Sequence, residues 1–375
     1  MVERRWLVSL GPPLAAALTF GLVASSSFGA TDRRWDPPPC PGGPDRLAQA
    51  AADANRTDGA GRPVPDAWFT LDPVLDGGGA LAGQRLRIGL GGQRASHVNL
   101  PAEASASGPF GRVVLVVADD GRRSEIRAID RRNSCAWSLG VSNDVVRRVI
   151  LDPAGTAVHE FRVDRTTRQD LGVWRRPIDG TAPQRVLGPV PDDARFGPTW
   201  STNLGWSEDA TTLAVQSCGA VNCRTRLLDT GRATVALLDE PGQGDLVGIV
   251  DGVAVTRSAC HALPCPVVVT DAATGRSSTL VDAAGPATLV AGPDGPRVAA
   301  ETPAGTELRD LDGRLDRTLD PPPAGRLVRS GNDATSGTGL PSGWLAWSPD
   351  GRSPDDAFIT RLSDGRTVRL SEVTP

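Results

Sequence analysis

The stretch DGVAVTRSACHALPCPVVVTDAATGRSSTL, residues 251–280, contains the pattern that decides the fold. A turn at Asp251-Gly252 precedes a short apolar strand, Val253-Ala254-Val255, and a second alternating strand leads into another turn at Asp271–Gly275. Gly readily adopts the positive φ that tight hairpin turns need, so Asp-Gly between alternating strands is a strong hairpin signal. We therefore expect two β-hairpins in close succession within this stretch.

The first of these turns recurs along the chain from residue 66 onward. Its last residue falls at positions 67, 111, 155, 210, 252, 295 and 351, so four of the six steps are 42 to 44 residues and two are longer. The clearest copy is Trp347-Ser348-Pro349-Asp350-Gly351, and the weakest is Pro65-Asp66-Ala67. The second turn recurs between these positions, at Gly92, Asn133, Gly180, Gly231, Gly275, Gly313 and Gly365.

Two interleaved series of seven turns imply four strands per repeat, which is typical of the blades of a β-propeller. A single blade cannot bury its apolar faces, whereas a ring of stacked blades buries them and protects the strand edges. We therefore predict an all-β fold, a β-propeller of about seven four-stranded blades. Six or eight blades, or unrelated hairpins in two sandwiches, are the alternatives, and the strand that closes the ring is not identified by the pattern.

The turn Trp347-Ser348-Pro349-Asp350-Gly351 and its relative Trp206-Ser207-Glu208-Asp209 resemble the repeat of TolB-like propellers. In that family such a turn precedes an apolar strand, and a second Asp-Gly turn follows. The resemblance covers about residues 66–375 and implies the fold rather than a particular function. The repeats lack the Gly-His and Trp-Asp signatures of WD-repeat propellers.

Residues 1–30 have the features of a secretion signal. Arg4 and Arg5 precede an uncharged run with the apolar segment Leu14–Ala24, and small residues follow it. Cleavage gives a secreted protein, and an uncleaved segment would be a membrane anchor, which Pro12-Pro13 disfavours. We divide the rest into a Pro/Gly/Ala-rich linker, residues 31–65, with a short helix at Leu47–Ala54 capped by Asp45, and the propeller, residues 66–375.

Six cysteines in an exported chain predict three disulfides. Two Cys pairs with five-residue separation lie at the same phase of adjacent repeats, in the hairpin between the second and third strands. The two remaining Cys would join the N-terminal segment to the outer strand of the second blade. The expected pairs are Cys218–Cys223, Cys260–Cys265 and Cys40–Cys135.

A zinc site is the alternative, with Cys260, His261 and Cys265 as ligands, either alone or together with Cys218 and Cys223. Structural zinc sites are usually built from Cys residues separated by two others and from four ligands brought together. The wider spacing and the predicted export both favour disulfides, and we expect no metal and no cofactor.

The composition excludes several kinds of active site. The chain has no Lys, so a phosphate-loop lysine and a Schiff base to a cofactor are excluded, and a Gly-x-Ser-x-Gly nucleophile motif is missing. The acidic pairs Asp119-Asp120, Asp192-Asp193 and Asp355-Asp356 lie in predicted turns, where Asp is common for backbone reasons. Paired carboxylates or a calcium site are the alternative interpretation, and we assign no catalytic residue.

His and Trp provide the remaining candidates. His97 lies in a candidate strand of the first blade, and His159 lies among apolar strand residues, where we expect a structural role. Four Trp residues fall near the innermost strands, where we expect packing between blades, with a stacking platform for a sugar or apolar ligand as the alternative. They are Trp200, Trp206, Trp344 and Trp347.

These features favour a binding or scaffolding module over an enzyme. A net charge of −4 without a basic stripe disfavours nucleic acid. We expect a monomer, secreted or in the cell envelope, that binds a protein or polysaccharide and contacts the membrane only through an uncleaved N-terminus. The alternatives are a calcium-dependent lactonase or lyase acting at the central channel, and a structural domain held at the membrane.

Overall fold

The computed structural model describes most of the chain from residue 37 onward, with one helix and many strands. No helix within the described part has both the length and the apolarity to cross a membrane. The described ranges are 37–52, 67–90, 96–101, 104–133, 135–190, 201–207, 211–219, 223–238, 244–250, 252–258, 262–292, 294–322, 325–328, 338–339, 343–348 and 358–369.

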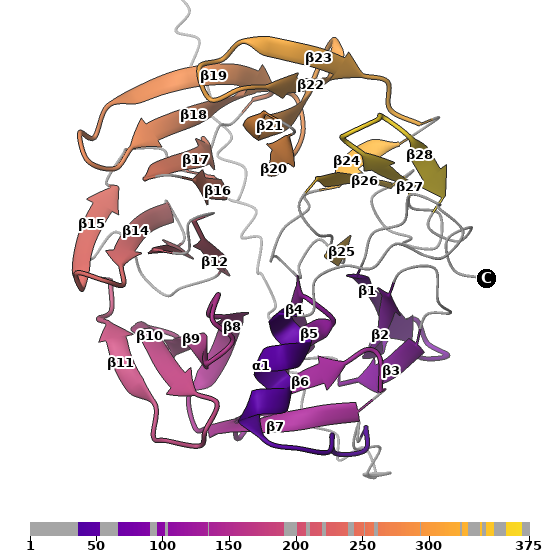
Figure 1. The fold of residues 1–375 in the computed structure, drawn as a ribbon, viewed down its shortest axis with the longest axis vertical. Helices are drawn as coiled ribbons and strands as arrows, with labels where there is room; N and C mark the ends of the chain where they lie inside the picture. The colour runs from indigo at the N-terminus through magenta and orange to yellow at the C-terminus, as the bar shows by residue number, and fades with distance from the viewer. Residues whose placement is uncertain are drawn as a thin grey trace, which may run out of the picture. The chain divides into compact units, whose positions relative to one another are not determined.

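The strands form seven antiparallel sheets of four, arranged as blades in a ring (Figure 1). The predicted seven-bladed β-propeller is therefore confirmed. Blade 1 contains β25 (Thr338–Gly339), β1 (Ala67–Leu75), β2 (Leu81–Leu90) and β3 (Ser96–Leu100). Blade 2 contains β4 (Ala104–Phe110), β5 (Val113–Asp119), β6 (Ser124–Asp130) and β7 (Cys135–Ser142). Blade 3 contains β8 (Val145–Leu151), β9 (Ala157–Val163), β10 (Asp170–Pro177) and β11 (Gln184–Leu187).

The other four blades follow the same order, from the innermost strand outward. Blade 4 contains β12 (Ser201–Trp206), β13 (Thr212–Cys218), β14 (Cys223–Asp229) and β15 (Thr234–Leu238). Blade 5 contains β16 (Asp245–Val250), β17 (Val253–Arg257), β18 (Cys265–Asp271) and β19 (Ser277–Ala283). Blade 6 contains β20 (Ala287–Gly292), β21 (Gly295–Thr302), β22 (Gly305–Arg309) and β23 (Leu315–Leu319). Blade 7 contains β24 (Arg326–Val328), β26 (Trp344–Ser348), β27 (Phe358–Arg361) and β28 (Thr367–Arg369).

Strand β25 closes the ring. It belongs to the connection between β24 and β26 of blade 7, yet its two residues pair with β1, Gly339 with Phe69 and Thr338 with Thr70. Blade 1 therefore takes its innermost strand from the C-terminal part of the chain, near the centre of Figure 1. The pairing spans only two residues, which is too short to leave a recognisable pattern in the sequence.

The turns of the first series precede the second strand of each blade, with one correction. Gly111, Gly155 and Gly252 each have positive φ in that place. The clearest copy in the sequence, at 347–351, instead falls between the second and third strands of blade 7, β26 and β27, and its last three residues lie outside the described part. Gly343, with φ of 85°, precedes β26. The last step of the series, from 295 to 351, is long because the turn at 347–351 lies one hairpin later in its blade than the other turns.

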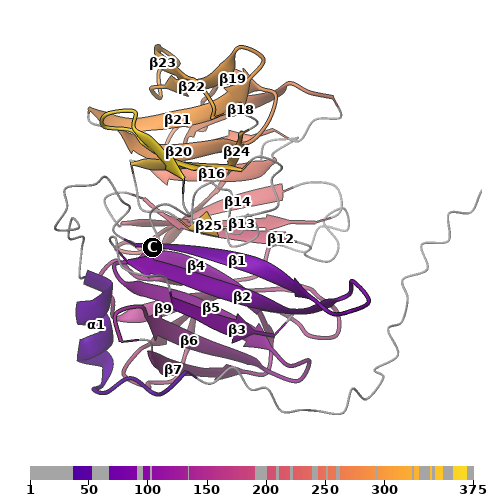
Figure 2. The ribbon, with the colours of Figure 1, turned by 90° about the vertical axis from the view of Figure 1, so that its right-hand side faces the viewer.

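Helix α1 (Pro44–Ala52) packs against blades 2 and 3, so part of the segment expected to be a linker belongs to the folded ring. Leu47 and Ala50 are buried in a cluster with core residues of β5 and β8. The Arg112 N–H donates to the Ala50 carbonyl at 3.2 Å, and a side chain at Gly111 would collide with the backbone of α1. We call the end of the ring that carries this helix the α1 end (Figure 2).

Two disulfides lie within the described residues and fit the expected pairs. Cys40 bonds to Cys135 at the start of β7, beside a parallel bridge between Pro39 and Ala136. Cys218 bonds to Cys223 and closes the β13–β14 hairpin. Cys265 is also disulfide-bonded, while Cys260 and His261 lie outside the described residues. The group formed by Asp130 with Cys40 and Cys135 offers no thiolate to a metal, because the two sulfurs are joined.

Candidate functional site

A cavity of about 600 Å³ lies between blades 3 and 4, at the α1 end. The β8–β9 turn, three strands of blade 3, the end of β12 and the β14–β15 turn form its wall. An adjoining hollow of about 350 Å³ shares part of this wall and reaches α1. Cavities of this size are typical of sites for small molecules. The lining residues are Asp152, Pro153, Ala154, His159, Arg175, Arg185, Val186, Trp206, Leu228, Thr230 and Ala233.

Strand alternation directs His159 into this cavity. Successive side chains of a strand point to opposite faces, so on β9 His159 and Phe161 face blade 4 while Glu160 and Arg162 face blade 2. His159 is only 3% exposed and meets the ring of Trp206 edge to face, with the centroids 5.1 Å apart. The Trp206 indole N–H donates to the Leu151 carbonyl at 2.9 Å, which fixes the orientation of that ring.

The imidazole of His159 has no hydrogen-bond partner among the described residues, and its Nδ1 is fully buried. Burial disfavours the charged form and lowers the pKa of His159 to about 4, although the carboxylate of Asp152 acts in the opposite direction. Arg175 adds a smaller lowering effect. His159 is therefore neutral at neutral pH.

The burial of His159 should make the stability of the fold depend on pH. The unfolded chain binds a proton at His159 near pH 6.5 and the folded chain only near pH 4, so stability is lost as the pH falls through this window and the loss is complete below it. The wild type should lose up to about 3 kcal/mol relative to His159→Gln between pH 6.5 and pH 4 in urea unfolding. His97→Gln controls for the loss of a histidine from the unfolded chain. A constant difference between wild type and His159→Gln would contradict this expectation.

Arg175 gives the cavity its positive charge. It lies on β10 opposite His159 of β9, is 41% exposed and lies 3.8 Å from Asp152. The carboxylate of Asp152 already accepts hydrogen bonds from the Thr156 N–H at 2.6 Å and the Thr156 hydroxyl at 2.7 Å. Arg185 on β11 lies opposite Trp174, so its side chain leaves the sheet on the other face. The cavity wall therefore presents one guanidinium beside a carboxylate that is largely committed to a turn.

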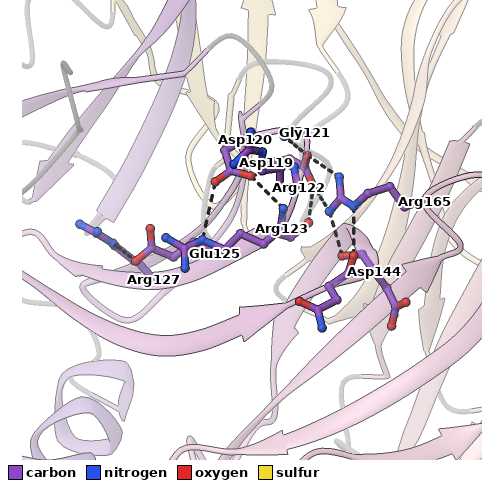
Figure 3. Close-up of polar contacts among 11 residues, drawn as sticks. Asp119, Asp120, Gly121, Arg122, Arg123, Glu125, Arg127, Asp144 and Arg165 are labelled. Carbon is purple, nitrogen blue, oxygen red and sulfur yellow. Dashed lines mark hydrogen bonds and ion pairs between the residues drawn. The ribbon is translucent and has the colours of Figure 1, made fainter. Parts of the chain in front are cut away.

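The acidic pair Asp119-Asp120 lies at the opposite end of the ring and holds turns together. Arg165, in the β9–β10 turn, donates to both carboxylate oxygens of Asp119 at 2.9 Å (Figure 3). Burial acts to raise the pKa of Asp119, but the hydrogen bonds from Arg165 and Ser124 outweigh it and the pKa lies below its usual value. Asp120 accepts the N–H groups of Arg122 and Arg123. These contacts support the turn interpretation, while Asp192-Asp193 and Asp355-Asp356 lie outside the described residues.

A second polar cluster is buried between blades 2 and 3. Glu160 on β9 is 0% exposed, and its carboxylate pairs with Arg162 at 2.7 Å and with the Nε of Arg176 on β10. Arg176 also donates to the Val141 carbonyl of β7 at 3.1 Å, and the Arg162 guanidinium lies 4.5 Å from the centre of the Trp174 ring. The cluster therefore links blades 2 and 3, as the buried pair of Arg226 with Asp170 links blades 3 and 4.

The aromatic candidates separate into two groups. Trp344 and Trp347 are buried on β26, as expected for packing between blades, and the Trp347 indole donates to Thr360 at 2.7 Å. Trp206 lines the cavity, while Trp200 lies outside the described residues. His97 is exposed on β3. The sequence did not single out Arg175, because one arginine on a strand carries no recognisable pattern.

Among the described strands, the β1–β2 hairpin of blade 1 has the longest pair. Its strands have 9 and 10 residues, against 7 in β5 and 7 in β6, and in Figure 2 it extends past the β5–β6 hairpin. Asp76 holds the tip, because its carboxylate accepts the N–H groups of Gly78 and Ala80 at 2.9 Å. Leu75 and Leu81 flank the tip as a cross-strand pair and are 59% and 48% exposed.

Comparisons with known proteins support the fold. No family model matches the chain, and no curated protein matches it. Among solved structures, the propeller domain of the trilobed protease from Pyrococcus furiosus aligns with a TM-score of 0.53 at 10% identity, over 82% of this chain and 95% of that domain. A prolyl endopeptidase structure aligns with a TM-score of 0.54 at 13% identity, over 88% of this chain and 52% of its own.

TolB from Acinetobacter baumannii aligns with a TM-score of 0.46 at 13% identity, over 68% of this chain and 64% of that one. The chain thus spans about half to two thirds of the length of TolB and the prolyl endopeptidase. The two structures with a TM-score above 0.5 come from a protease and a prolyl endopeptidase, and at 10% and 13% identity the feature that they share with this chain is the fold.

Proposed function

We propose that this propeller is an exported protein of the cell envelope or the extracellular space that binds a protein partner through the tip of its β1–β2 hairpin. The observation that carries the proposal is the exposed pair Leu75 and Leu81 on a hairpin whose turn is fixed by Asp76. Exposed apolar side chains on a preorganised element lose little conformational entropy on binding. Such residues are suited to protein recognition.

Export is supported by the residues at the N-terminus and by the cross-links. Two disulfides in the described part are typical of proteins that mature in an oxidising compartment. The uncharged, apolar stretch within residues 1–30 has the pattern of a signal segment. We therefore place the partner outside the cytoplasm, where this chain would act as a monomeric module.

A cross-linking experiment tests the partner and the compartment together. The chain is expressed from Met1 in its source cells, with a photo-reactive amino acid in place of Leu81. Intact mass before and after alkylation should show loss of the N-terminal segment and no free thiol until reduction. Cross-linking should give one discrete adduct, and Leu75→Ser should reduce its yield at least tenfold, since both leucines would enter the same contact.

The matched control uses β15, where Val235 and Leu237 are exposed to a similar degree. A photo-reactive residue at Val235 should give no adduct of that mass, and Leu237→Ser should leave the Leu81 adduct unchanged. Equal adducts from β15 and from the hairpin would overturn the proposed binding site. Full-length protein with free thiols in the cytoplasmic fraction would overturn export.

A further inference from the structure

The cavity between blades 3 and 4 has the properties of a built binding site. Its shape is fixed by strands and by two turns, and the Trp206 ring in its wall is held by the hydrogen bond to Leu151. A volume of about 600 Å³ is enough for a small organic molecule. Because it lies at the α1 end, away from the tip of the β1–β2 hairpin, the cavity is independent of the proposed partner contact.

His159 is a polar group that the protein itself leaves unpaired. Its side chain is only 3% exposed and lines the cavity, and its Nδ1 has no hydrogen-bond partner among the described residues. Buried polar side chains normally have a partner, and an exception calls for an explanation. A bound ligand would contact the ring at the cavity wall, whereas the unpaired Nδ1 is itself fully buried.

Charge selects the kind of ligand. The registers of β9, β10 and β11 set Arg175 beside His159 and Gln184, and Arg185 opposite Trp174 on the other face of the sheet. Arg175 lies 3.8 Å from Asp152 and has no hydrogen bond to any described residue, while the carboxylate of Asp152 is held by Thr156. Guanidinium groups bind carboxylates through paired hydrogen bonds. The site therefore favours an anion with a carboxylate group.

The rest of the wall favours a flat apolar body on that anion. Trp206 contributes an aromatic surface, and Val186, Leu228 and Pro153 contribute aliphatic surface. Aromatic rings pack well against such a surface in offset or edge-to-face geometry. We propose that this cavity binds a small aromatic carboxylate, with Arg175 on the carboxylate, Trp206 against the ring and His159 in contact with the ligand.

Proton and nitrogen NMR of the imidazoles tests this proposal directly. The chain has only three histidines, so His159→Gln assigns the signal of His159. Benzoate, 1-naphthoate and indole-3-carboxylate are titrated into the wild type at pH 7.5, and 1-naphthamide serves as the uncharged match. At least one carboxylate should shift the His159 signal saturably, and 1-naphthamide should bind at least tenfold more weakly than 1-naphthoate.

Two variants separate the site from nonspecific binding. Arg175→Gln should raise the dissociation constant at least tenfold, whereas Arg276→Gln, at an exposed arginine in the β18–β19 turn, should leave it unchanged. An unchanged His97 signal shows that each variant is folded. No saturable shift of His159 with any of the three acids, equal binding of the amide, or full affinity in Arg175→Gln would each overturn the proposal.

Discussion

Replacing Glu160 with Gln should destabilise the propeller by about 3–5 kcal/mol, the cost typical of removing one partner from a buried ion pair. Glu160 is completely buried and pairs with Arg162 and Arg176, so its loss leaves two cations without their main counter-charge. Asp144 lies 3.5 Å from Arg162 but is half-buried and serves only that arginine. Since domains are stable by about 5–15 kcal/mol, the loss is large.

Urea unfolding of Glu160→Gln measures this effect, and Glu125→Gln is the matched control. Glu125 and Arg127 have the same two-residue separation on β6 as Glu160 and Arg162 on β9, with an Nε to Oε1 distance of 2.8 Å. Glu125 is 29% exposed, so water screens its pair, and Glu125→Gln should cost less than about 1 kcal/mol. Equal costs at the two sites would contradict the argument from burial.

Glu160 also illustrates what the sequence could not predict. On β9 the residues Val158, His159, Glu160 and Phe161 alternate between two interfaces, and both interfaces are buried in a propeller. A charged residue in such a strand reads as solvent-facing, and no local pattern shows that Arg176 of β10 pairs with Glu160 while the Val141 carbonyl of blade 2 holds Arg176. The cavity escaped prediction for the same reason, because its wall comes from turns and strands of two blades.

The fold was predictable because its signals are local. Gly111, Gly155 and Gly252 occupy turn positions with positive φ, and each repeats at the same phase of its blade. The displaced turn at 347–351 did not alter the blade count, since Gly343 precedes β26 and the second series is intact. By contrast, the closing strand β25 depends on a two-residue pairing between distant parts of the chain, which no local pattern encodes.

The position of a cysteine pair within a repeat predicted which residues lie in contact. Cys218 ends β13 and Cys223 begins β14, so a shared position in the hairpin places the two residues opposite each other. For Cys40 and Cys135 the inference came from the two cysteines left over, and the structure adds the reason for their proximity. Pro39 forms a bridge with Ala136, which brings the segment before α1 alongside β7.

Removing the Cys40–Cys135 bond with a double Ser variant should lower the free energy of unfolding by about 4–5 kcal/mol. The bond joins two residues that are 95 positions apart in the sequence. In the chain-entropy model, a longer closed loop restricts the unfolded chain more strongly. The Cys218–Cys223 bond spans only 5 positions, so its double Ser variant should lose about 2 kcal/mol. Urea unfolding under oxidising conditions measures both variants against the wild type.

Measurements under reducing conditions distinguish the effect of losing the disulfide from the effect of replacing Cys by Ser. With a strong reductant present, the wild type and both Ser variants should unfold at nearly the same urea concentration, because every chain then lacks its disulfides. Helix α1 adds a second reason for the large effect, since the bond anchors the segment that carries Leu47 into the core between blades 2 and 3. A larger loss from the Cys218–Cys223 variant than from the Cys40–Cys135 variant would show that strand pairing, rather than loop length and helix docking, sets the contribution of these bonds.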